Sequence, residues 1–127
     1  MRLLLATTVT LLLLAPSCAF AVCLKAEERK TLIEGVLSEG TFKDANDNPE
    51  QAFILTPLVP TCLSGDPQLN ESEQVSTIHI YSSDQAVAQT IKSFVGKDVF
   101  VQGTPFGAHT AHYHAPIVID VTGIQLN

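Results

Sequence analysis

Residues 75–106 read VSTIHIYSSDQAVAQTIKSFVGKDVFVQGTPF, and the spacing of the apolar residues changes twice within them. Val75 to Tyr81 is rich in β-branched residues, which is typical of a strand. Asp84 to Val95 has apolar residues at helical spacing, and Asp98 to Phe106 alternates like a strand again. The segment therefore predicts a strand, one short helix and a second strand.

The helix carries its own start and stop signals. Val87, Ile91 and Phe94 recur at a spacing that places them on one helical face. Ser83 is available as N-cap, and Gly96 follows as the expected C-terminal stop. These signals predict a helix that packs one apolar face on a sheet.

Three further strands flank this segment. Thr31 to Phe42 is apolar and β-branched, and Gly35 in its middle predicts a bulge or sharp bend. Ala52 to Val59 is a second strand, in which Pro57 favours an edge position or a bulge. Pro116 to Leu126 is the last strand. The connecting segments are polar or rich in turn residues and are predicted as loops: 44–50, 61–74 and 107–115.

The predicted order is thus three strands, a helix and two strands. This connectivity is that of an OB-fold-like, mainly β domain, a five-stranded Greek-key barrel with one short helix between strands three and four. A bent first strand suits this fold, because that strand contributes to both sheets. A generic α+β sandwich is the alternative.

The first 21 residues have the three zones of a secretory signal peptide. Arg2 gives a positive start, Leu3 to Leu14 is almost purely apolar, and Ala19 to Ala21 offers a small-x-small cleavage site. The apolar run is shorter than the ~20 residues that a membrane helix needs, so no stable membrane anchor is expected. We therefore expect export to the periplasm or beyond, and one mature domain over residues 22–127.

The mature domain is acidic. Residues 1–21 contain Arg2 and no acidic residue, so removing them leaves 6 Lys and Arg against 13 Asp and Glu, a formal charge of −7. Such a domain repels phosphate backbones, and nucleic acid is not an expected partner. Its partner is expected to be an unidentified protein or small ligand.

Cleavage also changes the cysteine count from three to two, Cys23 and Cys62. An even number of cysteines in an oxidising compartment indicates a disulfide. The alternative is a pair of free thiols. A bridge would close a loop of about forty residues and stabilise the fold by ~3–4 kcal/mol on the chain-entropy model.

Histidines gather in the loop between the last two strands. Three of the four histidines, His109, His112 and His114, lie there beside Thr110 and Tyr113. In an OB-fold this loop and the loop between the first two strands flank the binding face. The latter loop carries three acidic residues, so the candidate binding residues also include Asp44, Asp47 and Glu50. Two independent solvated loops are the alternative.

A metal site at His109, His112 and His114 is not favoured, because the cluster contains no cysteine or carboxylate. No cofactor is expected. The motifs of serine hydrolases, zinc proteases, nucleotide-binding loops and dinucleotide-binding folds are missing, so no catalytic residue and no enzyme activity are predicted. His79, within a predicted strand, is interpreted as structural.

The stretch from Gly96 to Val121 resembles an uncharacterised family of exported bacterial domains, domain of unknown function 4431. Its pattern is G-T-x-F followed by A-H-T-x-H-H-H and an apolar strand. The matching residues are Gly103, Thr104, Phe106, Ala108, His109, Thr110, His112 and His114. Tyr113 stands where the family has its middle histidine. The resemblance implies bacterial export and brings no known activity. The strand order is also similar to that of small periplasmic OB-fold proteins that serve as binding modules.

Three functional hypotheses follow. The first is a non-catalytic exported binding module, with its site on the face flanked by loops 44–50 and 107–115. The second is an inhibitor or immunity-type protein of an exported enzyme, which suits a small, acidic, disulfide-bonded domain. The third is a metal-binding protein or metal-dependent enzyme, and it depends on the histidine loop alone.

Overall fold

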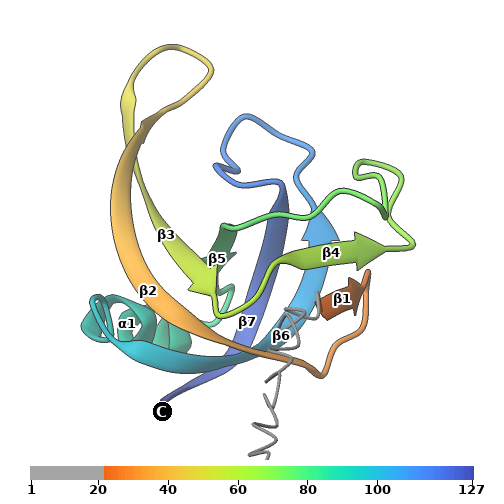
Figure 1. Ribbon diagram of the computed structural model, residues 1–127. Helices are drawn as coiled ribbons and strands as arrows, with labels where there is room; N and C mark the ends of the chain where they lie inside the picture. Colours follow the sequence, from red (N-terminus) through yellow and green to blue (C-terminus); the bar gives the residue numbers. More distant parts are fainter. Residues whose placement is uncertain (1–21) are drawn as a thin grey trace, which may run out of the picture.

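Five strands close into a barrel in the order β2, β3, β5, β7, β6 (Figure 1). The computed structural model describes residues 22–127, so the predicted signal peptide lies outside the described residues. The barrel strands are β2 (Thr31–Lys43), β3 (Pro49–Pro57), β5 (Ile78–Tyr81), β6 (Asp98–Gly107) and β7 (Ile117–Leu126). All neighbours are antiparallel except β5 and β7, which are parallel. This is the predicted OB-fold-like barrel, and it excludes the α+β sandwich.

Strand β2 belongs to both halves of the barrel. Its first part pairs with β6 and its second part with β3, and Gly35 pairs with Val99 on one side and Pro57 on the other. The predicted change of direction around Gly35 is therefore the point where β2 passes from one partner to the other. Pro57 is the last residue of β3, where its missing N–H interrupts no further pairing.

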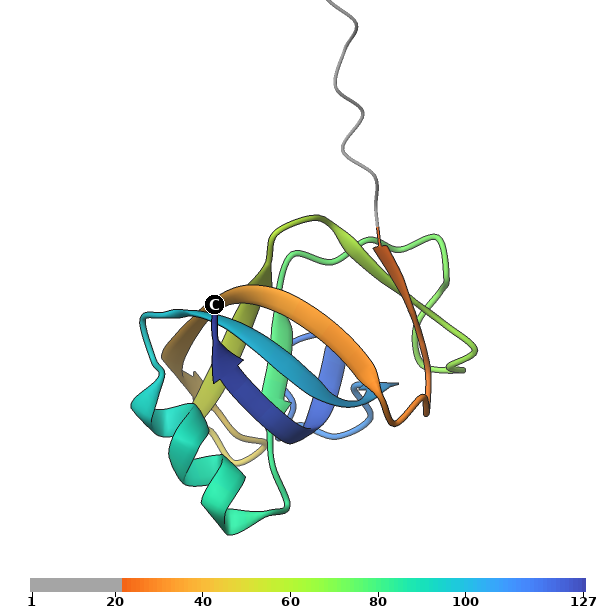
Figure 2. The ribbon, with the colours of Figure 1, turned by 90° about the horizontal axis from the view of Figure 1, so that it is seen from below.

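Helix α1 (Gln85–Ser93) lies between β5 and β6 in the chain and at the end of the barrel away from the β2–β3 hairpin (Figures 1 and 2). Ile91 is fully buried against the core. The helix N-cap is Asp84, not the predicted Ser83. The Asp84 carboxylate accepts the N–H groups of Ala86 and Val87, and it therefore satisfies two otherwise unpaired donors.

Two short strands were not predicted. Strand β1 (Val22–Lys25) pairs in parallel with β4 (Thr61–Ser64), which lies in a segment predicted as loop. Each contributes only one buried apolar residue, Leu24 in β1 and Leu63 in β4, so neither shows a visible alternation. Val75 forms an isolated bridge to Thr61, so the third barrel strand begins later than predicted.

The core fills the barrel with aliphatic side chains. The largest fully buried side chains are those of Leu37, Leu55, Leu63, Ile78, Ile80, Ile91, Val99, Val101, Ile117, Val118, Ile119 and Val121. Among residues 22–127, no helix is long and apolar enough to span a bilayer.

Candidate functional site

The two loops predicted to flank the site are linked by one carboxylate. Glu50 accepts hydrogen bonds from His112 Nδ1 at 2.7 Å and from His114 Nε2 at 2.9 Å. Glu50 belongs to β3 rather than to the turn, because the turn ends at Asn48 and β3 begins at Pro49. The side chain of His114 is only 8% exposed and stacks on Phe42 with ring centroids 4.6 Å apart. Phe42 and Glu50 pair beside the turn of the β2–β3 hairpin, so these contacts tie the turn end of the hairpin to the histidine loop.

The same contacts act on the charge of Glu50. Hydrogen bonds from His114 and then His112 hold the pKa of the Glu50 carboxyl below its ordinary range. The carboxylate is therefore ionised at neutral pH, and each of its two oxygens accepts a hydrogen bond from one of the rings.

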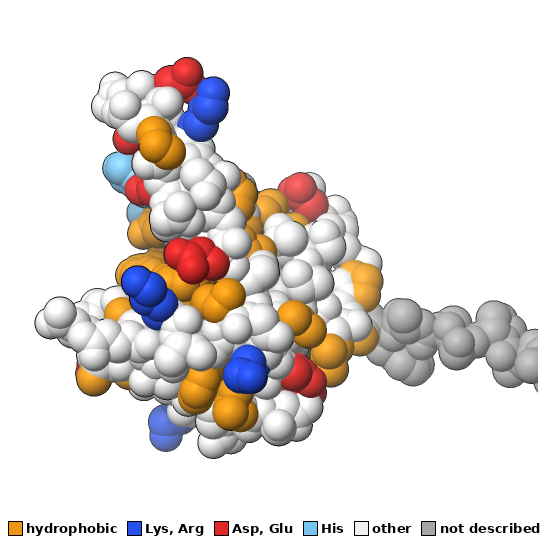
Figure 3. Space-filling view, turned by 90° about the vertical axis from the view of Figure 1, so that its left-hand side faces the viewer, with side chains coloured by type: hydrophobic (Ala, Val, Ile, Leu, Met, Phe, Trp, Pro, Cys, Tyr) orange, Lys and Arg blue, Asp and Glu red, His pale blue; other side chains and the backbone are white. Residues whose placement is uncertain are grey.

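Asp44 and Asp47, also predicted as site residues, do not contact the histidine loop. Asp44 accepts the N–H groups of Asn46 and Asn48, and the Asn48 bond is the main reason why the pKa of Asp44 is lowered. Asp47 pairs with Lys43 at 3.3 Å with both side chains largely exposed. Figure 3 shows the hairpin standing out from the barrel with charges at its tip and histidines against its flank. These two aspartates shape the turn.

His79, the one histidine outside the histidine loop, lies below that loop. His79 is 8% exposed, and its Nδ1 accepts the backbone N–H of His114 at 3.1 Å. Burial, followed by the neighbouring His114, lowers the pKa of His79. Because His79 supports the loop from beneath, its role in this structure is structural. Thr110 also orders the loop, since its hydroxyl accepts the N–H of His112.

The opposite side of the histidine loop lines an open groove of ≈ 380 Å³. Four rings contribute to it, those of Tyr81, Phe106, His109 and Tyr113, with neighbouring centroids 5.3–6.4 Å apart. Burial, together with the Tyr113 hydroxyl and Asp120, raises the pKa of Tyr81 to about 12. Tyr81 is therefore a neutral phenol at any physiological pH.

Two carboxylates stand among the residues that line this groove, Glu27 and Asp66, and no lysine or arginine does. Each is fastened to the end of β6. The N–H of Glu27 donates to the carbonyl of Pro105 at 2.9 Å, and Asp66 accepts the N–H of Gly107 at 2.9 Å. A side chain at Gly107 would collide with the Asp66 carboxylate in its present position, so glycine lets the carboxylate approach this closely.

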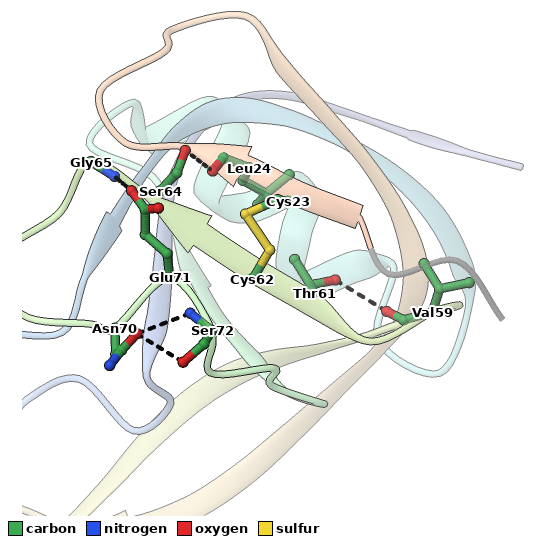
Figure 4. Close-up of a disulfide and its surroundings, with 10 residues drawn as sticks. All are labelled: Cys23, Leu24, Val59, Thr61, Cys62, Ser64, Gly65, Asn70, Glu71 and Ser72. Carbon is green, nitrogen blue, oxygen red and sulfur yellow. Dashed lines mark hydrogen bonds between the residues drawn. A yellow bond between two sulfur atoms is a disulfide. The ribbon is translucent and has the colours of Figure 1, made fainter. Parts of the chain in front are cut away.

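The disulfide sets these two anchors side by side. Cys23 and Cys62 face each other across the β1–β4 pair with Cα atoms 4.4 Å apart, and their sulfurs are bonded (Figure 4). Cys62 thus lies in β4, within the segment 61–74 that was predicted as a loop. Glu27 follows Cys23 by four residues, and Asp66 follows Cys62 by four. The loop after β4 is ordered by side-chain hydrogen bonds, such as the one from Gly65 N–H to Glu71.

Within residues 22–127, no group of three or more His, Cys, Asp or Glu side chains is placed to hold a metal ion. His112 and His114 instead donate to Glu50, and His109 lies on the groove side, with Nδ1 3.2 Å from the Gly107 carbonyl oxygen. The three loop histidines are therefore divided between two sides of the loop.

The sequence prediction included Tyr113 and His109 but missed Glu27, Asp66, Tyr81 and Phe106. One signal was available for the rings: the chain contains only two tyrosines, and both lie in the groove. No local signal marks the carboxylates, since they are brought together by strands far apart in the sequence.

One family model matches part of this chain. Residues 77–125 match the model of a family described as a domain of unknown function (DUF4431). The matched residues include β5, α1, β6, the histidine loop and nearly all of β7, so the resemblance predicted from residues 96–121 is confirmed.

No curated protein matches the chain. Among solved structures, the chain is similar to the small single-stranded DNA-binding protein from Streptomyces coelicolor. The identity is 17% and the TM-score is 0.40, and the alignment covers 76% of this chain and 90% of that chain.

Proposed function

We propose that this protein is an exported, non-catalytic binding module whose ligand site is the groove between the histidine loop and the loops after β1 and β4. The observation that carries the proposal is the gathering of Tyr81, Phe106, His109 and Tyr113 around one open groove. Exposed ring surface in a concave site supplies most of the contact area for small ligands and partner side chains.

The other side of the loop supports this function by holding the groove wall in place. Glu50 binds both His112 and His114, and His79 binds the loop backbone. A wall that is already ordered loses little conformational entropy when a ligand binds. The histidine loop thus serves as a fixed support, and its histidines are not ligands of a metal in this proposal.

Fragment screening by NMR tests the site. A mixture of small cationic, neutral and anionic fragments should shift amide signals of residues 66–68 and 105–113 in the ¹⁵N-labelled mature protein. The variant Tyr113→Leu should lose these shifts. Phe100→Leu is the matched control, because Phe100 is a half-exposed ring of β6 that lines a different surface. If no fragment of any charge shifts the groove, the proposed function is wrong.

Export is proposed from residues 1–21 and from the disulfide, which suits an oxidising compartment. Mass spectrometry of the protein recovered from its native host should show an N-terminus at Val22. An intact Met1, or a lipid on Cys18, would overturn this part of the proposal.

A further inference from the structure

We propose that the groove binds an organic cation, an ammonium or guanidinium group, between its rings and the carboxylates of Glu27 and Asp66. The inference depends on the proposed function, since it names the ligand class of the same groove. The cation is either a basic side chain of a protein partner or a small quaternary ammonium compound, and the experiment below separates these sources.

The rings that line the groove can attract a cation. A cation within about 6 Å of an aromatic centroid is attracted by the electron-rich face of the ring. Centroids of neighbouring rings in the groove are 5.3–6.4 Å apart, so one cation can lie within reach of more than one ring. Clusters of this kind suit cations that carry apolar surface, because such cations lose little hydration on entry.

The carboxylates of Glu27 and Asp66 give the groove negative charge. Glu27 is exposed, and Asp66 is half-buried and accepts the N–H groups of Gly107 and Gln68. Each carboxylate oxygen can accept more than one hydrogen bond, so Asp66 retains capacity for a ligand. Because no lysine or arginine lines the groove, these negative charges are not neutralised there. An anionic ligand would be repelled by the same charges.

The backbone of Glu27 is held in place at the groove. Glu27 has φ 65°, in the left-handed region that glycine or asparagine adopts more readily. Its N–H is nevertheless held by Pro105 at the end of β6, which fixes the residue at the groove.

Paired probes that differ in charge but not in shape test the inference. Choline is compared with its uncharged carbon isostere 3,3-dimethylbutan-1-ol, and N-acetyl-arginine amide with N-acetyl-citrulline amide. Each is titrated into the ¹⁵N-labelled mature protein with its disulfide intact. At least one cation should shift the groove amides and bind about tenfold more tightly than its neutral partner, and added salt should weaken it. Preference for the arginine probe assigns a protein partner, and preference for choline assigns a small quaternary ammonium compound.

Two substitutions locate the charge effect. Glu27→Gln should weaken cation binding several-fold and leave the neutral probe unchanged. Glu28→Gln is the matched control, because Glu28 is the adjacent exposed glutamate and does not line the groove. It should have no effect.

Equal binding of charged and neutral probes would overturn the inference and leave the proposed function standing. The inference would also be overturned, and the proposed function would stand, if neutral or anionic fragments shifted the amide signals of the groove while neither cation did. A groove that responds to no probe and no fragment would overturn both. If Glu27→Gln binds the cation as wild type does, the assignment of the carboxylates is wrong.

Discussion

Glycine at two strand positions makes room for a neighbouring backbone. A Cβ at Gly35 would collide with the carbonyl oxygen of Thr56, and one at Gly103 with that of Asp120. Backbone atoms inside a closed barrel cannot move aside as the end of a flexible side chain can. At Gly123, in contrast, the nearest atom to an added Cβ is 3.9 Å away.

We therefore expect Gly35→Ala and Gly103→Ala each to lower the free energy of unfolding by about 1–3 kcal/mol, the usual cost of overpacking. Gly123→Ala, the matched control, should change it by less than about 0.5 kcal/mol. Urea denaturation of the three variants measures the difference. Equal stability of Gly35→Ala and Gly123→Ala would show that β2 can shift at this position.

His79 makes stability depend on pH. Its pKa in the folded state is lower than the ordinary value of 6.5, chiefly because the ring is buried. Between these two values the unfolded chain binds more protons than the folded one. The contribution of His79 to the free energy of unfolding is therefore fully present above about pH 6.5. It declines as the pH falls through 6.5 toward the folded-state pKa of His79. The contribution of Glu50 is lost separately, below its ordinary value of 4.5.

The variant His79→Asn should flatten this dependence between about pH 7.5 and 5, since asparagine does not titrate. Its amide oxygen can still accept the N–H of His114, so the variant should fold, with about 1–2 kcal/mol less stability from lost ring packing. Chemical denaturation at several pH values is the measurement. An unchanged slope in the variant would mean that another group causes the pH dependence.

At the scale of elements, Glu50 links the β2–β3 hairpin to the histidine loop. Glu50→Gln removes the charge that both rings contact, and we expect the amides of residues 108–116 to exchange with solvent faster. Asp47→Asn is the control, because the exposed Lys43–Asp47 pair at the hairpin tip contributes little. Hydrogen exchange followed by NMR compares the two. Equal protection of the loop in both variants would contradict the proposed support of the groove wall.

The disulfide joins β1 to β4 across a sequence separation of 39 residues. Replacing both cysteines by serine should lower the free energy of unfolding by about 4 kcal/mol on the chain-entropy model. Reduction of the wild-type protein should lower its melting temperature in the same way. Calorimetry measures both effects. Titration of two free thiols in the unreduced, denatured protein would show that the bond does not form.

At the scale of the whole molecule, the acidic charge leads us to expect that nucleic acid does not bind. Residues 22–127 have a formal charge of −7, and the groove is lined by two carboxylates. We expect no binding of single-stranded DNA up to about 100 μM protein, the weak end of non-specific affinity, even at low salt. Fluorescence anisotropy with a labelled oligonucleotide is the test, with a basic DNA-binding domain as positive control. Salt-dependent binding at lower concentrations would contradict this expectation.

Local pattern was enough to predict the barrel. The five barrel strands and α1 differ in apolar period, and neighbouring residues set that period without reference to the rest of the chain. The glycine at position 35 lies where β2 changes partner from β6 to β3. The pairing of Cys23 with Cys62 was predictable, because only two cysteines follow the expected cleavage site.

The composition of the site was decided by tertiary structure. The sequence suggested an acidic loop facing a histidine loop, yet only Glu50 makes that contact, while Asp44 and Asp47 shape the turn. Glu27 and Asp66 meet at the groove because β1 and β4 pair in parallel. With only one buried apolar residue each, β1 and β4 leave no periodic signal. A pairing between segments 39 residues apart also depends on packing that no local stretch of sequence encodes.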